Sequence, residues 1–235
     1  MDILDSLKNI FYKSGTKVLT DTSRVALLDA NGNPIGSANM EELVRKVAAT
    51  LTSPDDYVDL GLPSGLLWGT KNLGATSPTG YGWYFSWGNL EGHPEGSGYD
   101  FSQTVYDATT AASISKDLEI SQDAVRAIKG GTWRMPTQYD FAELFNSAYT
   151  TNEWTTVNGV NGRKVTSKIN GKTLFFPAAG RYNGASLNNR GSSGFYWSSS
   201  WVSATYARSL DFNSSGVGPQ NSSSRRCGFS LRGVM

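Results

Sequence analysis

The stretch 177–234 is the feature that most constrains the fold of this chain, because two kinds of residue are interleaved along it. Successive side chains of a β-strand point to opposite faces, so regularly spaced apolar residues predict a buried face. The framework positions are apolar or glycine, at the spacing of short strands: Gly194, Tyr196, Trp197, Ala207, Leu210, Phe212, Phe229 and Leu231. We therefore expect short strands that leave the intervening residues exposed.

The residues between these framework positions are small, polar or aromatic. Such residues dominate antibody-type binding loops, where aromatics give rigid contact area and Ser and Asn give adaptable hydrogen bonds. Tyr206 and Arg208 flank Ala207, so an inward Ala207 would turn both outward, as an interaction hot spot requires. The predicted ligand-binding surface consists of Tyr182, Asn183, Ser186, Asn188, Asn189, Ser193, Phe195, Trp201, Ser203, Tyr206, Arg208, Asn213, Ser215, Asn221 and Ser223.

Composition and charge narrow the classes of partner. Hydrophobic residues make up 38% of the 235-residue chain, enough for a sizeable core, and 26 glycines favour short strands joined by turns. The net charge is +1 without a basic stripe, so we expect no nucleic-acid partner. The small basic cluster of Arg225, Arg226 and Arg232 is expected to be solvated or paired rather than phosphate-binding. No apolar run approaches the length of a membrane span, so membrane insertion is not expected.

Few residues could carry catalysis or hold a cofactor. Cys227 is the only cysteine and His93 the only histidine, so an internal disulfide, a multi-cysteine metal site and a Ser/His/Asp set elsewhere are excluded. His93 lies in a Gly-His-Pro-Glu-Gly loop, and no paired carboxylates stand at a suggestive spacing. The sequence therefore predicts a protein that is not an enzyme and has no cofactor or metal.

Residues 1–53 differ in pattern from the rest and predict a small helix–hairpin–helix segment. Apolar residues recur at helical spacing at Ile3, Leu4, Leu7, Ile10 and Phe11. A hairpin turn follows at Asn31-Gly32, and a second helix capped by Asn39. Such a segment buries little area alone, so we expect it to serve attachment or oligomerisation, most simply as a homotrimer. The alternative is that it packs on its own domain.

Residues 54–235 predict one α+β domain with two short helices and a strand-rich second half. After a polar loop at 89–118, Ser121 is expected to cap the first helix, which Gly130 ends. Thr137 should cap the second, with Asp140 at the capping-box position. The tryptophans of this domain are expected in the core or in hairpin packing: Trp68, Trp83, Trp87, Trp133 and Trp154.

Several ordered motifs in residues 57–235 carry a resemblance. They are Tyr57-Val-Asp-Leu-Gly-Leu-Pro-Ser-Gly, Trp68-Gly-Thr-Lys-Asn-Leu-Gly-Ala, Tyr84-Phe-Ser-Trp-Gly, Gly131-Thr-Trp-Arg-Met-Pro-Thr, Leu174-Phe-Phe-Pro-Ala-Ala-Gly, Gly194-Phe-Tyr-Trp-Ser-Ser-Ser and Gly228-Phe-Ser-Leu-Arg. Together they resemble the Fibrobacter-type major paralogous domain, a C-type-lectin-like family of gut Bacteroidetes and their phages. The resemblance implies a C-type-lectin-like domain of the formylglycine-generating-enzyme variant over residues 54–235. That enzyme holds copper with two cysteines, and this chain has one.

The C-terminal region resembles more narrowly the variable proteins of diversity-generating retroelements. Those systems rewrite adenines, so an Asn codon (AAY, where Y is C or T) can become any codon of the form NNY, where N is any base. NNY codons cannot encode Lys, Glu, Met, Gln or Trp. Residues 178–226 contain no Lys, Glu or Met, although all three occur upstream. Trp197 and Gln220 would then be fixed framework, and Trp201 either framework or derived from another template codon. The variable region would span about 180–227.

This resemblance implies a ligand-binding or receptor-binding protein of a phage or prophage tail, present in the virion and made in the bacterial cytoplasm. Its ligand would be a cell-surface protein or glycan, whose identity varies. The acidic N-terminal start lacks the apolar core of a signal peptide, which fits release by lysis. The alternative is a non-diversified adhesive or structural bacterial domain, in the cytoplasm or at the cell surface. A degenerate relative of an enzyme is a third hypothesis.

Calcium dependence provides a first test of the sequence analysis. Calcium-dependent lectins supply carboxylate and amide oxygens from a Glu-Pro-Asn or Gln-Pro-Asp loop, and the nearest match, Gly218-Pro-Gln-Asn, has no carboxylate. We expect calcium added after chelation to leave the melting temperature unchanged. A rise of more than a few degrees would contradict this prediction, because a ligand that binds only the folded state stabilises it.

Overall fold

A computed structural model describes residues 17–21, 24–28, 34–38, 56–103 and 114–235. The chain forms two compact units, Met1–Ser53 and Pro54–Met235. The helices predicted around residues 3–11 and 39–51 lie outside the described residues, as does the turn at Asn31-Gly32.

The described part of the first unit is a three-stranded antiparallel sheet. Its strands are β1 (Lys17–Asp21), β2 (Arg24–Leu28) and β3 (Pro34–Ala38), in the order β1-β2-β3. The predicted hairpin is confirmed as β2 and β3, which pair in antiparallel register. The prediction of a hairpin alone was wrong, since β1 adds a strand on the other edge of β2. Its Val-Leu-Thr run has the β-propensity for this role.

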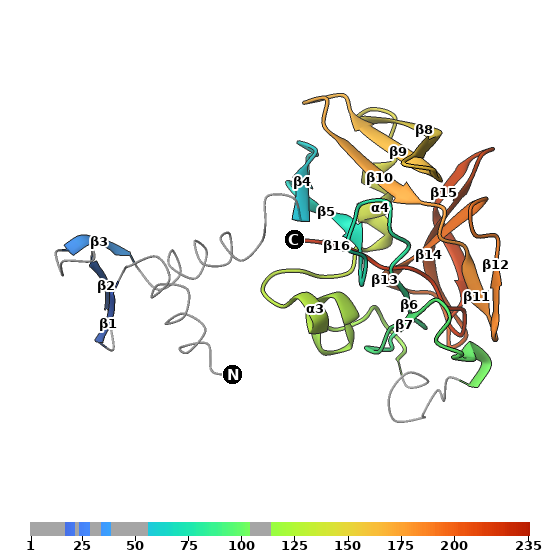
Figure 1. Ribbon diagram of the computed structural model, residues 1–235, viewed down its shortest axis with the longest axis horizontal. Coiled ribbons are helices and arrows are strands. Elements are labelled where there is room, and N and C mark those ends of the chain that lie inside the picture. The colour runs from blue at the N-terminus through green and yellow to red at the C-terminus, as the bar shows by residue number, and fades with distance from the viewer. Residues whose placement is uncertain (1–16, 22–23, 29–33, 39–55, 104–113) are drawn as a thin grey trace. The chain divides into compact units, whose positions relative to one another are not determined.

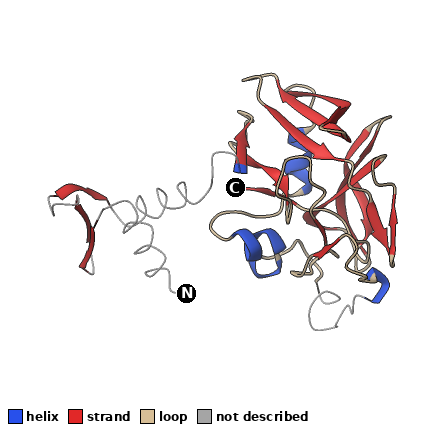
Figure 2. Ribbon diagram, in the orientation of Figure 1, coloured by secondary structure: helices blue, strands red, loops and turns tan. Residues whose placement is uncertain are grey.

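The second unit is α+β and mainly β (Figures 1 and 2). Its helices are α3 (Ala124–Lys129) and α4 (Gln138–Leu144), with short 3₁₀ turns at Phe101–Gln103 and Ile120–Gln122. Its strands are β4 (Tyr57–Asp59), β5 (Leu67–Asn72), β6 (Trp83–Tyr84), β7 (His93–Pro94), β8 (Thr150–Val157), β9 (Val160–Ser167), β10 (Thr173–Pro177), β11 (Arg181–Asn183), β12 (Ser186–Asn188), β13 (Ser193–Trp201), β14 (Tyr206–Asn213), β15 (Val217–Ser224) and β16 (Arg232–Val234).

The strands of this unit form small antiparallel sheets rather than one large one. The three-stranded sheets have the orders β13-β14-β15, β10-β9-β8 and β16-β5-β4, and β11-β12 and β6-β7 are two-stranded. In the third sheet the last strand of the chain, β16, pairs with β5 near the start of the unit, where Figure 1 shows the C-terminus. Between β8 and β9, Asn158 and Gly159 have φ angles of 50° and 79°, as a two-residue hairpin turn requires.

The hydrophobic core lies on both faces of the sheet β13-β14-β15. Tyr196 and Leu210, which are paired across β13 and β14, belong to a cluster with Trp68, Phe141 and Phe176. The neighbouring Trp197 faces the other way and stacks on Phe229, with ring centroids 4.1 Å apart. Consecutive residues of one strand therefore fill two different clusters, so this strand is buried on both faces.

The framework positions predicted from the sequence are buried. Tyr196, Trp197, Ala207, Leu210, Phe212, Phe229 and Leu231 are at most 3% exposed. The prediction for the tryptophans is also confirmed, since Trp68, Trp87 and Trp133 are buried and Trp83 and Trp154 pack partly buried against the two clusters.

The second predicted helix begins as expected. The Thr137 hydroxyl accepts a hydrogen bond from the Asp140 backbone N–H, and the Asp140 carboxylate accepts one from the Thr137 N–H, which completes a capping box. The same carboxylate lies 2.7 Å from the Arg134 guanidinium. The interaction is local in sequence, which explains why the sequence alone predicted it.

The cap predicted for the first helix was wrong. Asp123, not Ser121, caps α3, and its carboxylate accepts hydrogen bonds from the backbone N–H groups of Arg126 and Met135 at 3.0 and 2.7 Å. Ser121 lies in the preceding 3₁₀ turn. The carboxylate binds both the helix and the segment that follows it, whereas a serine hydroxyl has fewer lone pairs to share between two donors.

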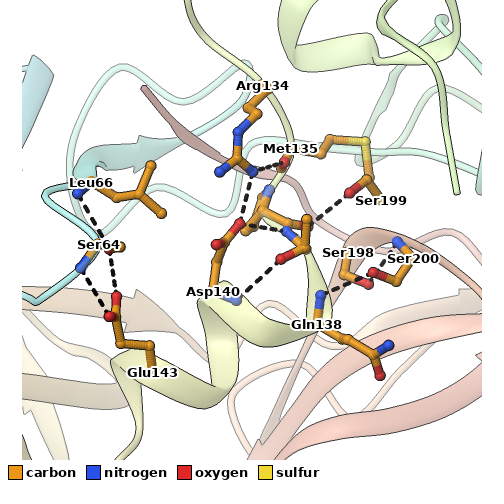
Figure 3. Close-up of polar contacts among 12 residues, drawn as sticks. Ser64, Leu66, Arg134, Met135, Gln138, Asp140, Glu143, Ser198, Ser199 and Ser200 are labelled. Carbon is orange, nitrogen blue, oxygen red and sulfur yellow. Dashed lines mark hydrogen bonds and ion pairs between the residues drawn. The ribbon is translucent and has the colours of Figure 1, made fainter.

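Helix α4 is fixed to its neighbours by polar contacts at both ends (Figure 3). At its start, the Gln138 N–H donates to the Ser200 hydroxyl of β13 at 3.1 Å. Near its end, the Glu143 carboxylate accepts hydrogen bonds from the Ser64 N–H and hydroxyl, at 3.0 and 2.5 Å. These contacts hold α4 against β13 and the β4–β5 connection, so the polar residues at the two ends of α4 have a structural role.

Two arginines of the predicted basic cluster are buried, so the solvated alternative was wrong for them. Arg225 lies 4.4 Å over the Trp87 ring and donates a hydrogen bond to the Ile114 carbonyl oxygen at 3.0 Å. Arg232 is bonded to groups of β5 and β10, whereas Arg226 is exposed. The contacts of Arg225 and Arg232 are to the protein's own groups, which leaves neither for a phosphate.

The stacked pair Trp197 and Phe229 generates a stability prediction. Truncating either residue to alanine should lower the free energy of unfolding by about 3 to 5 kcal/mol, because it opens a cavity in a packed core. Tyr206, which is 47% exposed, is the matched control and should change stability by no more than about 0.5 kcal/mol when truncated. Denaturant unfolding of Trp197→Ala, Phe229→Ala and Tyr206→Ala measures this. Equal losses in all three would show that Tyr206 belongs to the core.

Candidate functional site

Most of the polar residues predicted to bind a ligand lie where the hairpin β11-β12 meets the sheet β13-β14-β15. Figure 1 shows the two side by side, and a bridge between Gly180 and Gly194 joins them. On the sheet, Ser193 pairs with Asn213 and Phe195 with Asp211, so these four side chains share one face.

The hairpin contributes to the same face. The Arg181 guanidinium lies 4.9 Å over the Phe195 ring. Arg181 pairs with Asn188, and Asn183 pairs with Ser186, so all four hairpin residues lie on one face of the hairpin. We call the combined face the hairpin–sheet surface. It comprises Arg181, Asn183, Ser186, Asn188, Ser193, Phe195, Asp211, Asn213 and Asn221.

Solvent exposure differs among the predicted site residues. Those that are exposed are Asn183, Ser186, Asn188, Asn189, Tyr206, Asn213, Ser215 and Asn221, and those that are half-buried are Tyr182, Ser193, Phe195, Trp201, Ser203 and Arg208. The exposed members are almost all Asn and Ser, which leaves their hydrogen-bonding groups open to a ligand.

Tyr206 is exposed, as predicted, whereas Arg208 is half-buried, and neither residue joins the hairpin–sheet surface. In β14 they share a face with Leu210, whereas Asp211 and Asn213 lie on the opposite face. Arg208 is half-buried and donates a hydrogen bond from Nη1 to the Gln220 carbonyl oxygen at 3.1 Å. Tyr206 and Arg208 therefore form a second patch, separate from the hairpin–sheet surface.

The structure excludes Ser223 from any binding surface. It is 7% exposed, pairs with Ala207 in the covered part of the face that carries Asn221, and has its hydroxyl 3.2 Å from that of Ser209. Trp201 is half-buried, and its indole N–H donates to the Ile114 carbonyl oxygen at 3.1 Å. Trp201 therefore has the contacts expected of a framework residue, packed against a core cluster, although it was also predicted to belong to the ligand-binding surface.

Three further members form turns with their own polar groups. The Asn213 Oδ1 accepts hydrogen bonds from the N–H groups of Ser215 and Gly216, at 2.8 and 3.2 Å. The Ser203 hydroxyl accepts one from the Tyr206 N–H at 3.1 Å. Asn189 has a φ angle of 60°, a left-handed conformation that Asn tolerates better than most residues. The Asn213 and Ser203 side chains therefore shape their own turns, which reduces their capacity to bind a ligand.

Tyr182 lies on the opposite face of the hairpin, in an aromatic cluster. Its ring is 4.9 Å from that of Tyr84 and 5.2 Å from that of Phe101. His93 stacks on Tyr99 at 3.5 Å and contacts Phe101 edge-on. The contacts of Tyr182 are therefore those of a residue that anchors the hairpin to the 93–103 segment.

Arg181 and Asp211 belong to the hairpin–sheet surface although the sequence analysis did not select them. Burial raises the pKa of the Asp211 carboxyl, and hydrogen bonds from Ser209 and Asn221 and the charge of Arg181 oppose that shift. The available signal was the two-residue spacing of Arg181 from Asn183 and of Asp211 from Asn213, which places each pair on one face of a strand.

The hairpin–sheet surface offers amides, hydroxyls, one aromatic ring, one cation and one carboxyl group, the elements of a binding surface. Within the described residues, no group of three or more His, Cys, Asp or Glu side chains could hold a metal ion. In the same part of the chain, no helix has the length and apolar character needed to cross a membrane.

Comparison with known proteins gives a family match for only part of the chain. A family described as a domain of unknown function, DUF8237, matches residues 154–234, which include β9 to β16 and the second half of β8. No curated protein and no solved structure matches the chain.

The half-buried Asp211 carboxyl generates a pH prediction. Because its pKa is higher in the folded than in the unfolded protein, the folded state binds the extra proton, and stability falls as pH rises from about 4 through the folded pKa. Asp211→Asn should therefore raise the melting temperature at pH 7, and the difference from the parent protein should shrink toward pH 3. A constant difference at all pH values would contradict the role of ionisation. Asn213→Ala, which removes no charge, is the control.

Proposed function

We propose that the protein is a ligand-binding or receptor-binding protein that displays a diversified surface on a C-type-lectin-like domain, as part of a phage or prophage tail. The hairpin–sheet surface is the proposed binding site, and Tyr206 and Arg208 border a second contact patch. The ligand would be a cell-surface macromolecule.

The observation that most supports a binding role is the division of labour within single strands. In β14, Tyr206 and Asn213 are exposed, while Ala207 and Phe212 beside them are at most 3% exposed. A strand held by its buried residues can change its outward residues at little cost in stability, because exposed substitutions away from such contacts have small effects. A diversified surface needs this property.

The residue types of the hairpin–sheet surface fit rewriting through NNY codons. Asn, Ser, Phe, Arg and Asp can all be encoded by NNY, and these types account for every residue of that surface. Arg181 and Asp211 are included, although the sequence analysis did not select them. Trp201 and Gln220, which NNY cannot encode, lie outside the surface.

The resemblance to phage proteins motivates the remaining parts of the proposal. Attachment to a tail and assembly into a homotrimer are assigned to residues 1–53, which include the sheet β1-β2-β3. Light scattering on the full chain tests the assembly, and a monomer at micromolar concentration would overturn it.

Tolerance to randomisation tests the proposed binding surface. In a displayed library of the full chain with NNY codons at Asn183, Ser186, Asn188 and Asn221, most variants should remain resistant to protease, because these side chains are exposed. A matched library with NNY codons at Tyr196, Trp197, Leu210 and Phe212 should lose protease resistance in nearly all variants, because large-to-small changes in a core cost about 2 to 5 kcal/mol each.

Equal loss of folding in the two libraries would overturn the surface assignment. The diversification itself is tested on the genome that encodes the chain. We expect a neighbouring reverse-transcriptase gene and a near-copy of the codons for about 180–227 that differs only at adenines. Absence of both would favour the non-diversified adhesive or structural domain.

A further inference from the structure

Arg181 differs in its hydrogen bonding from the other buried or half-buried arginines of the second unit. Each of the others donates at least one hydrogen bond to the protein: Arg126, Arg134, Arg163, Arg208, Arg225 and Arg232. Arg181 is half-buried, and its Nε is inaccessible to solvent and has no hydrogen-bond partner, as is also true of Arg163 and Arg208, which bond through their Nη atoms instead. Within the described residues, the Arg181 guanidinium makes no hydrogen bond and no ion pair.

Such a group is costly in the free protein. A guanidinium carries five N–H donors, and a buried donor without a partner loses the hydrogen bonds that water would give it. The Phe195 ring, 4.9 Å from the Arg181 guanidinium, offsets part of this cost through a cation–π contact and holds the planar group in place. An unsatisfied buried donor in a folded protein calls for an explanation, and a bound partner is one.

The position of Arg181 points to a ligand. It lies in the hairpin–sheet surface, on the same face of the hairpin as the exposed amides of Asn183 and Asn188. A guanidinium fixed over a ring presents its donors as a planar fork, which matches the two oxygens of a carboxylate.

We propose that Arg181 binds a carboxylate group presented by an acidic side chain of a protein ligand, with Asn183 and Asn188 bonding the polar groups around it. This inference rests on the proposed binding function and names the ligand chemistry of that site. A doubly charged phosphate fits less well, because the neighbouring Asp211 carboxyl, within electrostatic reach of Arg181, would repel it more strongly.

The surroundings of Arg181 favour a protein over a sugar as the source of the carboxylate. A half-buried Phe195 beneath the cation and Asn and Ser side chains around it are the combination found in surfaces that bind proteins. The experiment below distinguishes a carboxylate of a protein from a carboxylate of an acidic sugar.

The first measurement asks whether Arg181 is needed for folding. Arg181→Met keeps a long side chain over Phe195 and removes the unsatisfied donors. Its melting temperature should equal or exceed that of the parent protein, because the cost of the buried, unpartnered Nε outweighs the cation–π contact with Phe195. A fall of more than about 5 °C would assign Arg181 a structural role and overturn the proposal.

The second measurement uses an array of random dodecapeptides, each made in two forms, with Glu or with Gln at the central position. The full chain should bind Glu forms at least about 10-fold more strongly than their Gln partners, as a charge-assisted bidentate pair requires. Arg181→Gln should abolish this preference. Arg181→Lys should retain only part of it, because an ammonium lacks the planar fork. Lys172→Gln, which removes an exposed charge from the turn between β9 and β10, should leave the preference unchanged.

The remaining outcomes separate this inference from the proposed function. Peptide binding that Asn183→Ala and Asn188→Ala weaken but Arg181→Gln leaves unchanged overturns the inference and keeps the binding surface. Binding that none of these substitutions alters overturns both. Binding to a sialylated or uronate glycan array but to no peptide, lost in Arg181→Gln, assigns the carboxylate to a sugar and overturns the protein source. Binding to neither array overturns the inference.

Discussion

The fold of the second unit depends on a buried arginine that joins distant strands. Arg232, in β16, donates hydrogen bonds to the Asn72 Oδ1 from Nε and Nη2 at 3.1 and 2.6 Å, and to the Gly69 and Phe175 carbonyl oxygens at 2.9 and 3.0 Å. Burial lowers its pKa to about 10. Asn72 in turn donates to the hydroxyl of Tyr196 at 3.1 Å. One side chain thereby links β16, β5 and β10 and, through Asn72, β13. Removing a hydrogen-bond partner of such a buried group leaves it unsatisfied, at a cost of about 1 to 3 kcal/mol and more where the group is charged.

The hydrogen bonds of Arg232 and the packed core hold the strands in place, and this explains why the hairpin–sheet surface can be polar. The framework residues belong to two hydrophobic clusters, one on each side of the sheet β13-β14-β15. Trp197 belongs to one cluster and Tyr196 to the other. Because stability comes from these contacts, the outward residues of the same strands are free to serve binding. The hairpin β11-β12 follows the same plan, since Tyr182 anchors it to aromatic rings on one face while Asn183 and Asn188 lie on the other.

Predictions that depended on short-range pattern succeeded. The capping box of Thr137 and Asp140 spans three residues, and the burial of Trp197 and Phe229 follows from apolar residues in strand-like runs. The fold was predicted only at the level of α+β, because the pairing of β16 with β5 joins residues more than 150 positions apart in sequence. The prediction of Ser121 as a cap was wrong because Asp123 also bonds Met135, and this contact across a loop is not visible in the local pattern.

The sequence by itself determined which residues of 177–234 are apolar and which are polar, and hence that a framework with outward polar residues forms. Only the tertiary structure decided which polar residues reach solvent. Ser223 and Asn221 are the same kind of residue two positions apart, and packing around Ala207 buries the first. Arg181 lies over Phe195 because Gly180 bridges to Gly194, and that pairing is fixed by the sheet rather than by neighbouring residues. A side chain's neighbours in space depend on the whole fold, whereas its polarity is a property of the residue alone.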